Sequence, residues 1–238
     1  MKMKFIAAST TALLVAFAAQ AQDVEPGFKS LFNGKDLTGW AGRNHWTVED
    51  GVISGTTTTE NPAKGNNFLI AKDANGSNTV VGDFELRFSY KFTGNSGNSG
   101  LQYRSLDKGN FVVHGYQGDF EVGNTYSGIL YEEGKTRGIM CARGDKVVFG
   151  EDGKKEAAGK TEKSSKEIQD SIKKGDWNDF VIIAKGPHLQ HFINGNLTAD
   201  IMDNDPKKQA LSGILAFQIH AGPPMKIQFK NVRIKALK

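Results

Sequence analysis

The sequence predicts an all-β fold, a sandwich or jelly roll of two antiparallel sheets, and three observations support this. From Phe84 to Phe92, apolar side chains alternate with polar ones, as in a strand with one buried and one solvated face. Similar short segments recur along the chain with turn residues between them. Glycine accounts for 28 of 238 residues, above the usual share of ~7%. That abundance is typical of many tight turns and argues against a helical bundle.

The first elements form a predicted hairpin. Trp46–Glu49 and Val52–Ser54 flank Asp50-Gly51, a pair that tolerates the positive φ of a hairpin turn. Later strands are expected at Phe84–Phe92, Leu101–Arg104, Phe111–Val113, Asp119–Val122, Phe180–Ala184, Gln190–Ile193, Gly213–Ile219 and Met225–Ile234. This number of short strands is enough for two packed sheets. We expect the three tryptophans to lie in the core between them, namely Trp40, Trp46 and Trp177.

Residues 144–175 depart from this strand pattern, being rich in Lys, Glu and Gly. Ser164 followed by Glu167 forms a capping box and predicts a short helix ending near Ile172. The stretch holds too few apolar residues for a core of its own. We therefore expect a surface insertion within a single domain that spans residues 22–238.

The N-terminus has the pattern of a secretory signal. Lys2 and Lys4 precede an uncharged run from Phe5 to Ala19, and Ala19-Gln20-Ala21 fits the small-x-small cleavage pattern. The run is shorter than the ~20 residues of a membrane-spanning helix. We expect residues 1–21 to be a cleaved signal peptide, which places the mature protein in the bacterial periplasm or outside the cell.

Charge and cysteine content exclude several classes of protein. Removing Lys2 and Lys4 with the signal lowers the formal net charge from +4 to +2. No basic block interleaved with aromatic residues remains, so we expect no nucleic-acid partner, and no membrane partner after cleavage. The single cysteine, Cys141, cannot form an internal disulfide and lacks a neighbouring acid or histidine that would mark a nucleophile.

Polar side chains gather on two of the predicted strands. Gln117, Asp119 and Glu121 alternate, so all three project from one face of a strand. A core position would leave two carboxylates buried at high cost, so we expect these residues to form the floor of a cleft. Gln218 and His220 likewise share a face, opposite an apolar one.

Three further residues are candidates for substrate binding. Arg104 follows Asn98-Ser99-Gly100, and Tyr131 and Arg137 flank the turn after Gly128. Aromatic and guanidinium groups often line sugar clefts. We predict that Arg104 joins the polar residues of the two strands on the concave face of one sheet.

A series of short motifs spans the mature chain in order. These motifs are the opening Gly27–Trp40, Phe84-Glu85-Leu86, Asn98-Ser99-Gly100 with Arg104, Gly128–Tyr131, Trp177-Asn178, Asn194-Gly195, Gln218-Ile219-His220 and Phe229–Lys235. Together they resemble the 3-keto-disaccharide hydrolase domain family. One departure lies in the central strand, where many members have Glu and then Gln but this chain has Gln117 and then Asp119.

The resemblance implies a concanavalin A-like sandwich that acts on glycosides already oxidised to a ketone at sugar carbon 3. Such a ketone acidifies the hydrogen on carbon 2, a base removes it, the aglycone leaves carbon 1, and water then adds to the enone. His220 is the expected base, with Asp119 and Glu121 as the other catalytic side chains. Substrate binding is expected from Arg104, Gln117, Gln218, Tyr131 and Arg137.

The sequence also allows a bound metal ion and two other functions. Asp119, Glu121 and His220 could together hold a divalent metal ion, while no organic cofactor is expected. The main rival function is a non-catalytic, lectin-like sugar-binding module on the same fold. A conventional β-glucanase is disfavoured because Gln117 and Val122 stand where its two glutamates would be.

Overall fold

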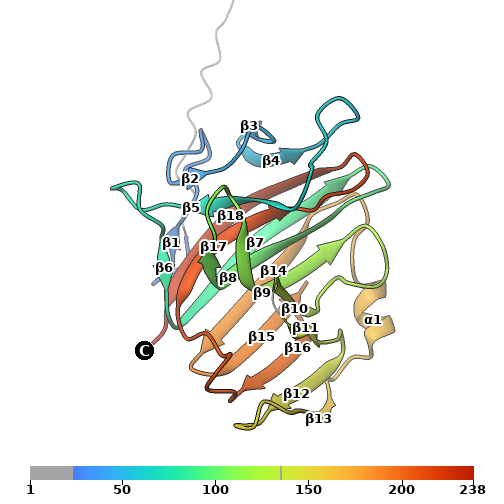
Figure 1. Ribbon diagram of the computed structural model, residues 1–238. Coiled ribbons are helices and arrows are strands. Elements are labelled where there is room, and N and C mark those ends of the chain that lie inside the picture. The colour runs from blue at the N-terminus through green and yellow to red at the C-terminus, as the bar shows by residue number, and fades with distance from the viewer. Residues whose placement is uncertain (1–23, 135) are drawn as a thin grey trace, which may run out of the picture.

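The computed structural model describes residues 24–134 and 136–238 and confirms the two-sheet β-sandwich (Figure 1). One sheet has ten strands, in the order β13 (Lys155–Lys160), β12 (Asp145–Phe149), β16 (Asn196–Asp203), β15 (His188–Ile193), β14 (Asn178–Lys185), β7 (Phe84–Thr93), β18 (Lys226–Ala236), β4 (Val52–Thr56) and β3 (Trp46–Glu49), with β1 (Lys29–Ser30) also paired to β18.

The second sheet has eight strands and carries the polar residues of the predicted cleft. Their order is β11 (Gly138–Cys141), β10 (Leu130–Glu133), β9 (Val113–Glu121), β8 (Asn98–Asp107), β17 (Gly213–Ile219), β5 (Asn67–Ala71) and β2 (Trp40–Ala41), with β6 (Val80–Val81) paired to β17. Pairing among the described strands is antiparallel, apart from the parallel pair of β12 and β16.

The predicted hairpin is confirmed as β3 and β4, paired through Glu49 and Val52. Asp50 and Gly51 both have positive φ, at 50° and 75°. This left-handed backbone matches the right-handed twist of the flanking strands, which explains why an Asp-Gly pair stands here.

The core between the sheets is aromatic. The alternating apolar residues of β7 are all buried, and Phe88 stacks on Phe180 with ring centroids 5.4 Å apart. Trp40 and Trp46 lie in this core as predicted. The expectation for Trp177 was wrong. It is only partly buried, and the ammonium groups of Lys91 and Lys230 lie 4.9 and 4.1 Å from its ring centroid.

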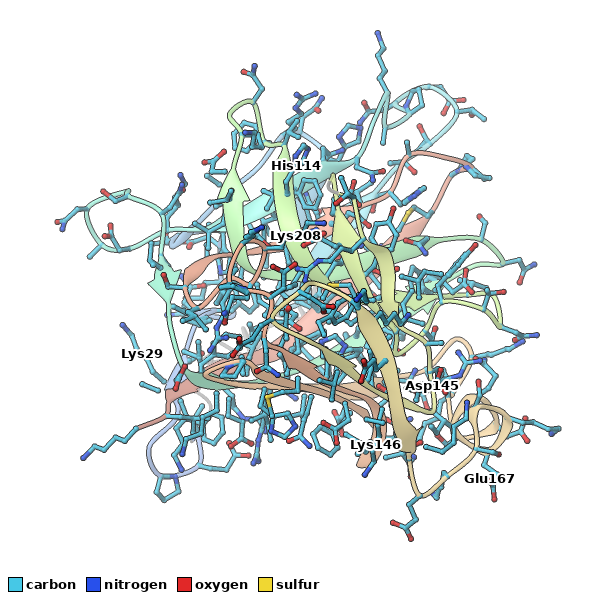
Figure 2. The ribbon with its side chains drawn as sticks, turned by 60° about the horizontal axis from the view of Figure 1, so that its bottom comes forward. Lys29, His114, Asp145, Lys146, Glu167 and Lys208 are labelled. Carbon is cyan, nitrogen blue, oxygen red and sulfur yellow. The ribbon has the colours of Figure 1, made fainter. Side chains whose placement is uncertain are left out.

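The segment predicted to be a surface insertion is built into the sandwich. Val147 and Phe149 of β12 are buried in the main core, and the capped helix α1 (Ser165–Asp170) buries Ile168. The capping box of Ser164 and Glu167 is confirmed. Figure 2 shows Asp145 and Lys146 of β12 and Glu167 of α1 towards the lower right of the molecule in that view.

A buried histidine links the two sheets. His191 of β15 is fully buried, with Nε2 2.9 Å from the hydroxyl of Tyr103 and Nδ1 3.2 Å from the carbonyl oxygen of Ile129. The carbonyl can only accept, so Nδ1 carries the proton and Nε2 accepts from the tyrosine. Burial lowers the pKa of His191 to about 4, so the ring is neutral near pH 7.

The pKa of His191 is lower in the folded than in the unfolded chain. The stability linked to its neutral ring is therefore fully present above pH 6.5 and is lost as the pH falls towards 4. We expect this group to remove up to about 3 kcal/mol from the free energy of unfolding across that range. In His191→Gln the unfolding free energy should be lower at pH 7 but should fall less between pH 7 and 4.5. Urea unfolding at both pH values checks this, and equal losses in the two proteins would contradict it.

The predicted signal peptide, residues 1–21, lies outside the described residues and stays a prediction. Among the described residues, no helix has the length and hydropathy needed to cross a membrane.

Candidate functional site

The outward face of the eight-stranded sheet divides into a covered part and an open part. Tyr116 and Phe120 of β9 point into the core between the sheets, so the alternate residues Gln117 and Asp119 project outwards. Near the other end of β9 this outward face is apolar and packs against Phe111 of the β8–β9 loop. The polar part is left open as a pocket.

This pocket has a volume of about 410 Å³, within the roughly 300–1,000 Å³ of small-molecule sites. Its lining combines carboxyl, imidazole, phenol and amide groups with one aliphatic side chain, from Asn66, Asn98, Gln117, Asp119, Tyr126, Tyr131, Glu133, Ile139 and His220. We call it the Asp119 pocket.

A chain of amide side chains joins the two carboxyl groups of the pocket. Gln117 Nε2 donates to Asp119 Oδ1 at 2.6 Å and to Gln218 Oε1 at 3.3 Å. Gln218 Nε2 in turn donates to Glu133 Oε2 at 3.2 Å. Gln102 Nε2 donates to Gln117 Oε1 at 2.7 Å, which fixes the orientation of the first amide. The polar groups of the floor are therefore held before any ligand arrives.

Asp119 has the properties of a proton donor. It is only 6% exposed. Burial raises its pKa well above the ordinary value, the bond from Gln117 opposes this, and the charges of Glu133 and Glu121 raise it further. Burial and the neighbouring charge of Glu133 also raise the pKa of Tyr131. Both groups are thus biased towards their protonated, hydrogen-donating forms.

His220 has the properties of a proton acceptor. It lies directly after the end of β17, is exposed, and lines the Asp119 pocket. Its Nδ1 is 2.5 Å from the carbonyl oxygen of Ala221, so Nδ1 carries the proton of the neutral ring. The lone pair on Nε2 is therefore available in the neutral ring.

Comparison with known families shows which family this chain belongs to. Residues 27–235 match the family model described as 3-keto-alpha-glucoside-1,2-lyase-like domain. The chain belongs to this family. The expected family and its carbohydrate-active role are confirmed, because the match covers almost the entire described chain. A search of curated proteins finds no significant match.

Solved structures with low sequence identity to this chain share its fold. A candidate glycosyl hydrolase from Parabacteroides distasonis has 22% identity and a TM-score of 0.55, covering 89% of this chain and 94% of its own. A second from the same organism has 18% identity and a TM-score of 0.56, covering 88% and 99%. The carbohydrate-binding module CBM66 from Bacillus subtilis has 13% identity and a TM-score of 0.52, covering 83% and 96%.

Five of the predicted site residues come together at the Asp119 pocket. Gln117, Asp119 and His220 line it, and the fully buried Gln218 lies beneath them in the amide chain. Tyr131, predicted for substrate binding, also lines it, since it pairs with Gln117 across β10 and β9.

Arg104 does not reach this pocket, contrary to the prediction. Its backbone has a φ of 46° at an irregularity in β8, which turns the side chain away from the face of Gln102. The buried guanidinium donates to the carbonyl oxygens of Gly82, Gly186 and Ala210 and pairs with Asp83 at 2.8 Å. Arg104 therefore holds loops together and lies outside the Asp119 pocket.

Arg137 was also placed wrongly. Its guanidinium pairs with Glu132 at 2.6 Å and with Asp203 at 2.9 Å, and all three side chains are nearly fully buried. The hydroxyl of Tyr116 also donates to Asp203. Arg137 thus belongs to an internal ion-pair network under the sheet.

Glu121 lies beside the pocket but not in its lining. Its carboxylate accepts from the backbone N–H groups of Thr125 and Tyr126 at 2.7 and 2.8 Å and so fixes the loop that follows β9. With Glu121 occupied in this way, the predicted metal ligands do not assemble. Within residues 24–134 and 136–238, no three His, Cys, Asp or Glu side chains are arranged to hold a metal ion.

Glu133 was missed in the sequence. It follows Tyr131 by two positions on β10, so both project from the same face into the pocket. Its carboxylate accepts from Gln218 and, at 3.2 Å, from Asn66 Nδ2. The alternation of Tyr131 and Glu133 was the signal that could have revealed it.

Gly100 makes room for the amide chain. A Cβ atom at this position would lie 2.5 Å from Cγ and 2.8 Å from Nε2 of Gln117. We expect Gly100→Ala to displace Gln117, to lower the free energy of unfolding by about 1–3 kcal/mol, and to lower activity. Gly65→Ala is the control, because a Cβ there meets open space. Urea unfolding compares the two variants, and similar small losses in both would contradict the expected clash.

Proposed function

We propose that this protein cleaves 3-keto-glycosides by elimination across sugar carbons 2 and 1, followed by addition of water. The observation that carries the proposal is the pairing, in one pocket, of a buried carboxyl with a raised pKa and an imidazole with a free Nε2 lone pair. Elimination needs an acid and a base of this kind at the same time.

In the first step, Nε2 of His220 takes the proton from carbon 2, which the neighbouring ketone acidifies. The electrons of that C–H bond form the double bond between carbons 2 and 1, and the bond from carbon 1 to the aglycone oxygen breaks. The protonated carboxyl of Asp119 gives its proton to the leaving oxygen. Tyr131 donates a hydrogen bond to the ketone oxygen, where negative charge develops.

In the second step, the same two groups work in reverse. The carboxylate of Asp119 takes a proton from the water that attacks carbon 1, and the imidazolium of His220 returns a proton to carbon 2. The net reaction consumes one water and gives the aglycone and a free 3-keto sugar. Both side chains end in the protonation states in which they began.

Membership of the 3-keto-alpha-glucoside-1,2-lyase-like family supports the elimination half of this scheme, since a 1,2-lyase breaks the bond at carbon 1 by elimination. The test is to incubate the protein with a 3-keto-glucoside and with the unoxidised glucoside, and to follow release of the aglycone. We expect release from the oxidised sugar alone. Equal turnover of both would overturn the proposal, and binding of either sugar without release would favour the lectin-like alternative.

A further inference from the structure

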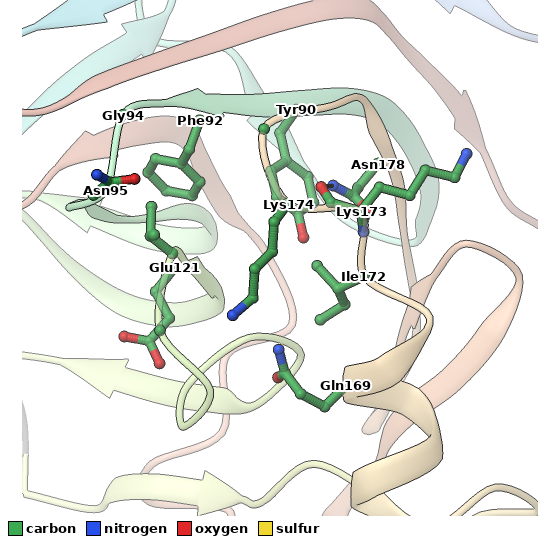
Figure 3. Close-up of a pocket in the computed structure, with 13 residues that line it drawn as sticks. Tyr90, Phe92, Gly94, Asn95, Glu121, Gln169, Ile172, Lys173, Lys174 and Asn178 are labelled. Carbon is green, nitrogen blue, oxygen red and sulfur yellow. Dashed lines mark hydrogen bonds between the residues drawn. The ribbon is translucent and has the colours of Figure 1, made fainter.

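A second pocket lies at the end of the sandwich, outside the Asp119 pocket. It is formed where the β7–β8 loop, the residues after β9, and the segment from α1 to β14 meet (Figure 3). Its volume is about 340 Å³, also within the roughly 300–1,000 Å³ of small-molecule sites. We call it the Tyr90 pocket.

Two buried polar atoms that help to form this pocket have no hydrogen-bond partner among the described residues. They are the hydroxyl oxygen of Tyr90 and Oε1 of Gln169. Tyr90 is only 1% exposed, so its hydroxyl has left bulk water without gaining a bond to a described residue. Such a group costs stability unless something binds it.

The chemistry of these atoms limits what can bind. Gln169 Nε2 donates to Asn124 Oδ1 at 3.3 Å, which leaves its Oε1 as an acceptor that needs a donor. Burial raises the pKa of Tyr90, so its hydroxyl stays neutral and can both donate and accept. Hydroxyl groups suit both atoms because each can donate and accept, whereas a carboxylate has no proton to give to Gln169.

The remaining lining suits the ring of a sugar. Phe92, Val122 and Ile172 supply apolar surface for C–H groups, and the amide of Asn95 lies near Phe92 (Figure 3). The exposed Lys174 extends between Glu121 and Gln169. Apolar walls with a few fixed polar groups are the usual form of a small-molecule site.

We propose that the Tyr90 pocket binds a neutral sugar of monosaccharide size, through hydroxyl groups that bond to Tyr90 and Gln169. The site is independent of the proposed reaction, and it adjoins the Asp119 pocket through one loop. Glu121 lines the Tyr90 pocket, and its carboxylate accepts a hydrogen bond from the backbone N–H of Tyr126. Tyr126 in turn lines the Asp119 pocket.

The test is an NMR titration of the full protein with D-glucose, following the Ile172 methyl and the Gln169 side-chain amide signals. We expect saturable shifts of both with a millimolar Kd, and no such shifts with D-glucuronate. In Tyr90→Phe, Kd should rise roughly three- to tenfold, the effect of one lost hydrogen bond. Tyr131→Phe, a matched change in the Asp119 pocket, should leave the Ile172 shifts unaltered.

Thermal unfolding shows whether the hydroxyl is free in the unliganded protein. Since Tyr90→Phe removes an unpartnered buried group, its Tm should equal or exceed that of the parent protein. A lower Tm would reveal a structural partner and overturn the proposal. It would also be overturned by glucose shifts confined to Tyr131 and His220, by the absence of saturation, or by an unchanged Kd in Tyr90→Phe.

Discussion

Replacing His220 by alanine is expected to lower kcat on a 3-keto-glycoside by roughly two to four decades, the usual contribution of a general base. The imidazole is exposed, and its one hydrogen bond to a described residue goes to the carbonyl oxygen of Ala221. Its loss therefore removes the base with little effect on packing, and Tm should change little. Steady-state kinetics and thermal unfolding measure the two effects separately.

His188→Ala is the matched control. His188 is partly exposed, and its Nε2 lies 2.6 Å from Oδ1 of Asp200. Both residues belong to the ten-stranded sheet, away from the Asp119 pocket. The control should keep the parent kcat. Full activity in His220→Ala would reject this histidine as the base and transfer the role to Glu133, an ionisable side chain in the lining of the same pocket.

The parts of the fold that local sequence determines were predictable. Apolar and polar residues alternate from Phe84 to Phe92 because one face of this strand packs against the core. The Asp50-Gly51 turn was predictable because these two residue types tolerate the positive φ that the turn requires. The capping box at Ser164 is equally local. In each case, neighbours within a few positions along the chain decide the structure.

The two misplaced arginines depend on contacts that are distant in sequence. Strict alternation puts Arg104 on the face of Gln102, but an irregularity in β8 interrupts the pairing with β9 after Tyr103. The acceptors that hold Arg104, Gly82, Gly186 and Ala210, lie far from it along the chain. Arg137 likewise pairs with Asp203 from the opposite sheet. A pattern of residue types does not reveal such partners.

The sequence predicted which site residues share a face of one strand, but not which residues of neighbouring strands lie opposite each other. Asp119 and Gln117 share a face by alternation alone, as do Gln218 and the strand-end His220. The register that places Tyr131 opposite Gln117 depends on how β10 and β9 pair. Glu133 enters the site only through that register, which explains why it was missed.

Relative to the parent protein, Asp119→Asn is expected to lower kcat by roughly two to four decades on substrates with poor leaving groups, because Asn cannot give a proton to the aglycone oxygen. A nitrophenyl aglycone leaves without such help, so the loss should be smaller for a 3-keto nitrophenyl glucoside than for a 3-keto alkyl glucoside. Equal losses for the two substrates would show that Asp119 does not act as the acid.

The same variant should be more stable than the parent protein at neutral pH. Because burial raises the pKa of Asp119 in the folded chain above its unfolded value, the stability linked to its protonation is present at pH below about 4 and is lost as the pH rises through the folded pKa. Asn cannot ionise, yet its side-chain oxygen can still accept from Gln117. The two proteins should therefore have similar unfolding free energies near pH 3, and at pH 8 the unfolding free energy of the variant should be higher by about 1–3 kcal/mol, the usual cost of a poorly compensated buried polar group.

Asp170→Asn, at an exposed position on α1, is the control and should show no comparable gain between the two pH values. Urea unfolding at pH 3 and pH 8 decides the matter, since a variant less stable than the parent at pH 8 would mean that the pocket favours an ionised Asp119 and cannot use it as a proton donor.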